Sequence, residues 1–199
     1  KAEIRELTPD DKAKGVIQIC EPFNLILDWW RYEERSIGKL KTWAGQMSVC
    51  SIAKDMQQAL KAEITENQNE INKILFMSSI KTAGQPYYFN ADYAGNAQAQ
   101  DVGFSIDKLT KGGVKIKTAS VPAVELLCLV GLQRARPQLA VCEKNKERLY
   151  DYRVWKDPLP ILLLPAAITG ELPLKYHRFR FANPSRAKDY RAFMPAILV

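Results

Sequence analysis

The chain of 199 residues is 47% hydrophobic and 26% charged, which is typical of a globular domain and not of a disordered or fibrous chain. No apolar run reaches the roughly 18–20 residues of a membrane span, and no secretory signal opens the sequence, so we expect no membrane segment and a cytoplasmic location. The four cysteines form no Cys-x-x-Cys pair and there is one histidine, so we expect reduced thiols, no metal site and no cofactor.

The charge is unevenly distributed. Residues 1–100 hold 12 Lys/Arg and 13 Asp/Glu, a net charge of −1, whereas residues 101–199 hold 17 and 9, a net charge of +8. A basic half of this kind favours an acidic partner, most often nucleic acid. The alternative is a solvated basic surface with no partner.

In the first half, residues 16–20 and 23–30 are expected to form strands, the second with Phe23, Leu25, Leu27 and Trp29 on one face. Residues 46–76 carry two apolar stripes at helical spacing, which predicts a helical insertion. Residues 90–104 are rich in small and amide side chains, a composition that suits either a ligand-contacting loop or an ordinary surface loop.

Residues 121–134 predict a helix that is apolar on nearly every face and therefore buried. Ser120 is a suitable N-cap, and Pro122 fits the first turn. Leu127 is expected in the core, and Gly131 suggests a close backbone crossing. We expect the rest of the chain to be organised around this helix.

Beyond that helix, residues 138–142 and 149–155 predict a hairpin, and residues 158–168 predict a short buried helix. Residues 174–181 predict a strand with Tyr176, Arg178 and Arg180 on one face and His177 with Phe179 and Phe181 on the other.

The predicted fold is therefore α+β: an antiparallel sheet packed on the buried central helix (121–134), with a helical insertion at about 46–76. We treat residues 1–199 as a single domain. The alternative is a division into a strand and helical subregion, 1–80, and a basic sheet subregion, 81–199. A sheet with helices on one face would resemble RNA-recognition-like domains, by analogy alone.

Candidate nucleic-acid contacts are the basic side chains of the loops, of the exit of the central helix and of the last strand. They are Lys39, Lys41, Lys111, Lys115, Lys117, Arg134, Arg136, Arg178, Arg180 and Arg186. Such residues bind the phosphate backbone without reading base sequence.

Several short motifs resemble, in one order, the third of the Csb protein families of type I-U (now I-G) CRISPR operons. They are FNL at 23–25 with DWW at 28–30, KTWAG at 41–45, AQAQDVGFS at 97–105, PAVELLCLVGLQR at 122–134, and DY at 151–152 with Trp155 and PLP at 158–160. The resemblance covers about residues 16–195. The family has a further N-terminal segment with an Asn-Pro-Gly motif, and we expect that segment to be missing from this chain.

The resemblance implies a subunit of a type I CRISPR effector ribonucleoprotein, with guide RNA, target DNA and other effector subunits as partners. It supplies no catalytic residues. The residues themselves leave open an alternative, a guide-RNA-processing ribonuclease in which His177 is the general acid or base, assisted by Lys175, Tyr176 or Arg178. We expect the non-catalytic reading, because a lone histidine on a strand face shared with phenylalanines is more often packed than catalytic.

Overall fold

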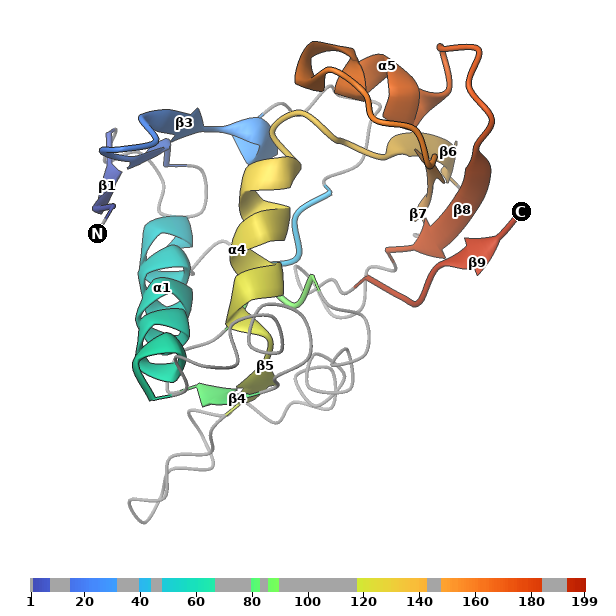
Figure 1. Cartoon of the computed structure of the whole chain (residues 1–199). Helices are drawn as coiled ribbons and strands as arrows, with labels where there is room; N and C mark the ends of the chain where they lie inside the picture. Colours follow the sequence, from blue (N-terminus) through green and yellow to red (C-terminus); the bar gives the residue numbers. More distant parts are fainter. Residues whose placement is uncertain are drawn as a thin grey trace.

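The computed structural model describes residues 2–7, 15–31, 40–43, 48–66, 80–82, 86–89, 118–142, 148–183 and 193–199. These residues combine helices with antiparallel sheets, so the predicted α+β class is confirmed (Figure 1). Among them, no helix has the length and apolar character needed to cross a membrane.

The N-terminal sheet consists of β1 (Ile4–Glu6), β2 (Ile17–Ile19) and β3 (Leu25–Leu27), paired antiparallel in that order. The strand predicted at residues 16–20 is confirmed. The strand predicted at 23–30 is only three residues long, because the 3-10 helix η1 (Trp29–Arg31) follows it. Successive residues of a strand point to opposite faces, and the helical turn instead buries Trp29 and Trp30 together.

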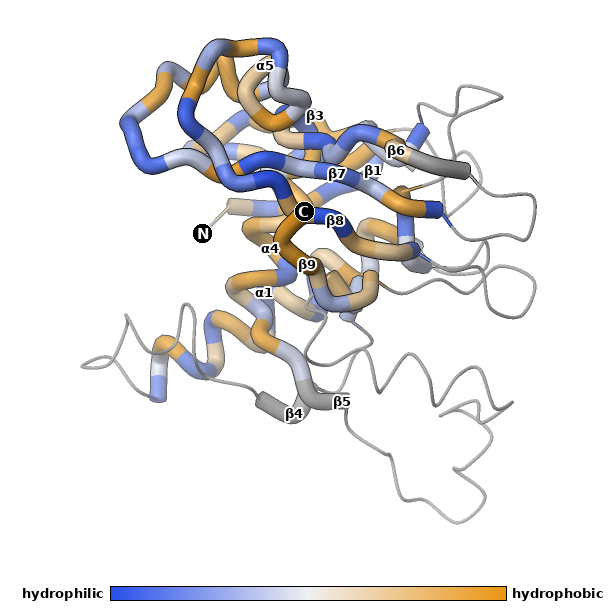
Figure 2. The backbone as a smooth tube through the Cα atoms, turned by 90° about the vertical axis from the view of Figure 1, so that its right-hand side faces the viewer, coloured by the Kyte–Doolittle hydropathy of each residue, from blue (hydrophilic) through white to orange (hydrophobic). Residues whose placement is uncertain are grey.

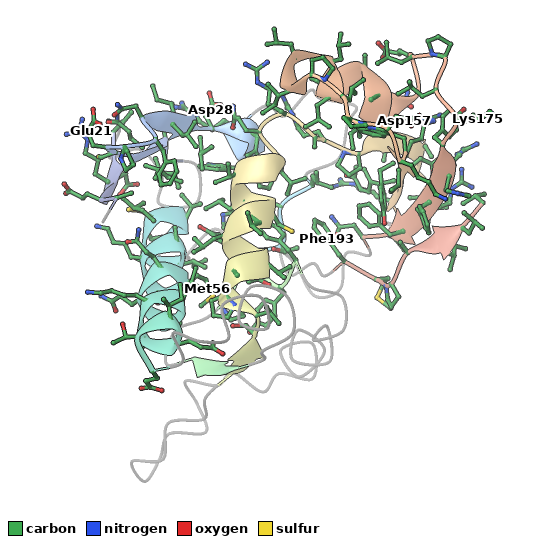
Figure 3. All side chains as sticks on the ribbon, in the orientation of Figure 1. Glu21, Asp28, Met56, Asp157, Lys175 and Phe193 are labelled. Carbon is green, nitrogen blue, oxygen red and sulfur yellow. The ribbon has the colours of Figure 1, made fainter. Side chains whose placement is uncertain are left out.

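The helices α1 (Val49–Glu66) and α4 (Pro122–Gly131) lie side by side below this sheet (Figure 1). Helix α1 lies within the predicted helical insertion at 46–76, whose residues 46–47 and 67–76 are outside the described part. It buries Val49, Ile52, Ala53 and Met56, which recur at the spacing of one helix face. Figure 3 shows Met56 directed from α1 toward α4.

Helix α4 differs from its prediction in several details. It begins after Val121, whose extended backbone precedes the first turn, whereas Ser120 belongs to β5 (Thr118–Ser120), which pairs with β4 (Ile80–Thr82). Among the described residues, no atom outside the neighbouring backbone of α4 lies within 4 Å of the position that a Cβ would take at Gly131, so the expected close crossing is wrong. Leu127 is 54% exposed, so its expected place in the core is wrong, whereas the other residues of α4 are buried or partly buried.

Leu129 occupies the buried side of α4, and the backbone carbonyl of Leu129 accepts a hydrogen bond of 2.9 Å from Trp29 Nε1. Two residues correspond to about 200° around an α-helix, so Leu127 lies nearly opposite. Leu127 therefore lies on the side of α4 opposite the one that packs against α1 and the tryptophans.

The difference between these two leucines gives a stability prediction. Leu129→Ala should lower the free energy of unfolding by about 2–5 kcal/mol, because it opens a cavity in the core. Leu127→Ala, the matched control, should change it by no more than about 0.5 kcal/mol, as exposed positions usually do. Urea denaturation followed by circular dichroism measures both. Equal losses would contradict the orientation of α4.

The C-terminal sheet contains β6 (Gln138–Cys142), β7 (Arg148–Val154), β8 (His177–Ala182) and β9 (Ile197–Leu198), in chain order. The hairpin predicted at 138–155 is confirmed. The strands of this sheet lie side by side in chain order, whereas the split βαβ units of RNA-recognition-like domains place strands side by side that do not follow one another in the chain. That analogy is therefore not supported.

Between β7 and β8 lie the 3-10 helix η5 (Ile161–Leu163) and the helix α5 (Leu164–Thr169). The sequence predicted a short buried helix here. The helix is confirmed, but the predicted burial is wrong, because Ile161, Leu162 and Leu163 are exposed.

Phe193 connects the C-terminal sheet to the rest of the core. Its ring stacks on Phe89 with centroids 5.7 Å apart and meets Phe181 of β8 edge-on at 5.2 Å. Figure 3 shows its side chain between α4 and the sheet. Phe89 in turn contacts the cluster of Trp29, Trp43 and Tyr87. A continuous aromatic core therefore holds the sheet, and the site on it, against the helices.

Candidate nucleic-acid interface

Four charged side chains meet on the outer face of β7 and β8. The register pairs Asp151 with Arg180 and Arg153 with Arg178, and directly paired residues of antiparallel strands point to the same face. The intervening residues give the opposite face stacked rings, Tyr150 on Phe181 and Tyr152 on Phe179. We call the four residues Asp151, Arg153, Arg178 and Arg180 the arginine face. Figure 2 shows hydrophilic and hydrophobic colours alternating along β7 and β8 and mostly hydrophobic colour along α4.

Asp151 binds two of these arginines through the Nε and Nη2 side of each guanidinium group. Arg180 donates from Nε to Oδ1 at 2.7 Å and from Nη2 to Oδ2 at 3.0 Å. Arg178 donates from Nε to Oδ2 at 2.8 Å, and its Nη2 donates to the same oxygen. Both arginines therefore use the Nε and Nη2 edge on Asp151, which leaves each Nη1 group directed away from the carboxylate.

Burial differs sharply across this ion pair. The Asp151 side chain is 4% exposed, whereas those of Arg178 and Arg180 are 39% and 26% exposed. The hydrogen bond from Arg180, together with those from Arg178, lowers the pKa of Asp151, against the opposing effect of burial. The same hydrogen bond to Asp151 raises the pKa of Arg180. Asp151 is therefore ionised at neutral pH and fixes two partly exposed guanidinium groups.

Arg153 has a structural role on the same face. Its Nη1 donates to the carbonyl oxygens of Ile168 and Thr169 at the end of α5, and its guanidinium carbon lies 5.1 Å from the centre of the Tyr176 ring. Gly170 follows with φ of 79°, and a Cβ there would collide with Arg153. Arg153 thus fastens α5 to β7. Three guanidinium groups and one carboxylate leave the arginine face with a net charge of +2.

The other predicted contacts are distributed differently. Arg134 and Arg136 are exposed just after α4, where they line a groove with residues of β3 and α5. Lys41 is buried, which does not favour contact with nucleic acid, and we leave it out of the interface. The remaining candidates, Lys39, Lys111, Lys115, Lys117 and Arg186, lie outside the described residues, as does the loop at 90–104.

His177 is exposed at the first position of β8, opposite Val154. Two of the residues expected to assist it are engaged elsewhere: Arg178 binds Asp151, and the Tyr176 ring lies against Arg153. Within the described ranges, no group of three or more His, Cys, Asp or Glu side chains could hold a metal ion.

Two members of the arginine face, Asp151 and Arg153, were not predicted as site residues. The signal was present, because Tyr150, Asp151, Tyr152 and Arg153 alternate between aromatic and charged side chains along a predicted strand. The sequence pattern does not give the register in which β7 pairs with β8, because a long connection separates the two strands.

No family model, curated protein or solved structure matches this chain.

Proposed function

We propose that this chain is a cytoplasmic subunit of a type I CRISPR effector ribonucleoprotein and binds the backbone of guide RNA, target DNA or both while packing against other effector subunits. The observation that carries the binding role is the pair of arginines held by buried Asp151. The assignment to a CRISPR effector rests on the order of motifs described above.

The geometry of the pair suits phosphate. Guanidinium groups bind phosphate oxygens through parallel N–H donors, and such charge-assisted bonds are stronger than neutral ones. With one edge of each guanidinium on Asp151, Arg178 and Arg180 lose less conformational freedom when an anion binds to the remaining donors. The stacked ring pairs of β7 and β8 lie on the face opposite Arg178 and Arg180, so these rings are not presented to bases beside the two arginines. The interface therefore favours backbone contacts without base reading.

The basic second half of the chain supports the same role. A protein that neutralises several phosphates releases counterions, so its affinity falls steeply as salt rises. The net charge of +8 on residues 101–199 supplies the long-range attraction, and the arginine face supplies a fixed contact.

Binding of the full chain to two single-stranded RNAs of unrelated sequence tests this proposal. Fluorescence anisotropy at increasing salt should give similar affinities for both RNAs, with log K falling against log salt by about 0.7 per phosphate contacted. Single-stranded DNA of the same sequences shows whether the 2′-hydroxyl contributes. Binding that is independent of salt, or absent both in the isolated chain and in the assembled complex, would contradict the proposal.

The ribonuclease alternative differs from the binding role in that it requires His177. RNA cleavage near neutral pH needs a proton donor and acceptor, and histidine is the side chain with a suitable ordinary pKa. In the binding role, His177→Ala leaves guide RNA maturation unaltered. Unprocessed guide RNA accumulating with a folded His177→Ala chain would favour the nuclease.

A further inference from the structure

An open groove of about 850 Å³ runs between β3, the end of α4 and α5. Figure 1 shows these three elements meeting at the upper end of α4. Its apolar walls come from β3, chiefly Leu25 and Ile26, and from η5 and the start of α5, chiefly Ile161 and Pro165. Arg134 and Arg136 stand at the same groove. We call it the α5 groove.

The walls of the α5 groove are unusually exposed for aliphatic side chains. Ile26 is 55% exposed and Ile161 is 71% exposed, and neighbouring Leu162 is also exposed. Clustered apolar residues on a surface mark sites of interaction, because their burial against another apolar surface is favourable. Single exposed aliphatic residues need no such explanation, but here two segments more than 130 residues apart present them to one groove.

The chemistry of the groove favours protein over nucleic acid. Its described lining contains no aromatic ring on which a base could stack. Aliphatic walls would strip water from a phosphate without returning hydrogen bonds. Protein interfaces, in contrast, combine an apolar centre with arginines, which are enriched in them. Arg134 and Arg136 were expected from sequence to contact nucleic acid, but their position here favours carboxylates that flank apolar anchors.

Three separate elements line the groove, which favours a helix as the occupant. Strand addition to β3 would use the backbone of three residues and would leave the walls from α4 and α5 without a role. We infer that the α5 groove binds an acidic amphipathic helix of another protein, with aliphatic anchors between β3 and α5 and carboxylates on Arg134 and Arg136. This inference does not depend on the proposed nucleic-acid function.

The probe that tests it is a fluorescein-labelled helical peptide of about 18 residues, five turns long, with leucines on one face and glutamates flanking them. A scrambled peptide of the same composition spreads the leucines around the helix. Anisotropy with the full chain should show saturable binding of the first peptide, at least tenfold tighter than that of the scrambled one.

Two variants locate the peptide. Ile26→Asp with Ile161→Asp should weaken binding at least tenfold, whereas Ile197→Asp, an equally exposed change on β9, should not. Arg134→Glu with Arg136→Glu should reverse the preference, so that a peptide with lysines in place of the glutamates binds better. Thermal melts confirm that the variants fold.

Equal binding of the scrambled peptide, or no effect of the isoleucine changes, would overturn the inference. So would displacement of the peptide by a single-stranded RNA that loses affinity in the Arg134→Glu, Arg136→Glu variant, because the groove arginines would then belong to nucleic acid.

Discussion

Replacement of Trp43 by alanine should lower the free energy of unfolding by about 3–5 kcal/mol. Trp43 is almost fully buried, and its ring lies 5.7 Å from Trp29, 5.8 Å from Trp30 and 5.0 Å from Tyr87, centre to centre. Aromatic pairs in such edge-on arrangements contribute beyond the area they bury. Since domains are stabilised by only about 5–15 kcal/mol, this loss is a large part of the total.

Phe23→Ala is the control for Trp43→Ala, because Phe23 is an aromatic residue of the same region that is 62% exposed. Its removal should change the free energy of unfolding by no more than about 0.5 kcal/mol. Urea denaturation followed by circular dichroism avoids reliance on tryptophan fluorescence. A Trp43→Ala chain as stable as wild type would mean that the aromatic core does not join η1 to residues 86–89.

Arg178→Gln combined with Arg180→Gln should weaken RNA binding by a factor on the order of 100 at moderate salt, because two charge-assisted phosphate contacts are lost. The loss should be similar for unrelated RNA sequences, and the salt dependence should become shallower. Anisotropy titrations at several salt concentrations measure both quantities.

Two comparisons separate the arginine contacts from general charge. Lys156→Gln with Lys175→Gln removes the same charge from exposed positions nearby and should have a smaller effect. Arg178→Lys with Arg180→Lys keeps the charge but not the forked donors, and its affinity should be intermediate. If both glutamine pairs weaken RNA binding equally, Arg178 and Arg180 contribute only their charge and make no specific contact with phosphate.

The sequence predicted the α+β class and the C-terminal hairpin because their periodic patterns are local. Alternation along residues 149–155 and 174–181 identified β7 and β8, and the helical spacing from Val49 to Met56 identified α1. Which strands pair, and in which register, depends on contacts between distant residues. Asp151 was therefore not connected with Arg180, 29 residues later.

Hydrophobic composition alone led to wrong predictions of which side chains are buried in α4 and α5. Leu127 belongs to an almost wholly apolar helix, yet its side chain is 54% exposed, whereas its neighbours Leu126 and Cys128 pack partly buried against the core. Ile161, Leu162 and Leu163 likewise read as core residues but line or adjoin an open groove. Apolar sequence indicates what favours burial, and the fold decides which side chains are covered.

The most direct test of the central claim is the RNA affinity of Asp151→Asn. The change removes one negative charge at nearly constant volume, so the net charge of the chain rises from +7 to +8. Attraction by charge alone would make RNA binding tighter. If Asp151 positions Arg178 and Arg180 for phosphate, the folded variant should bind RNA more weakly than wild type at the same salt, despite its greater positive charge. Unchanged or tighter binding would contradict the assignment of the arginine face as the nucleic-acid interface.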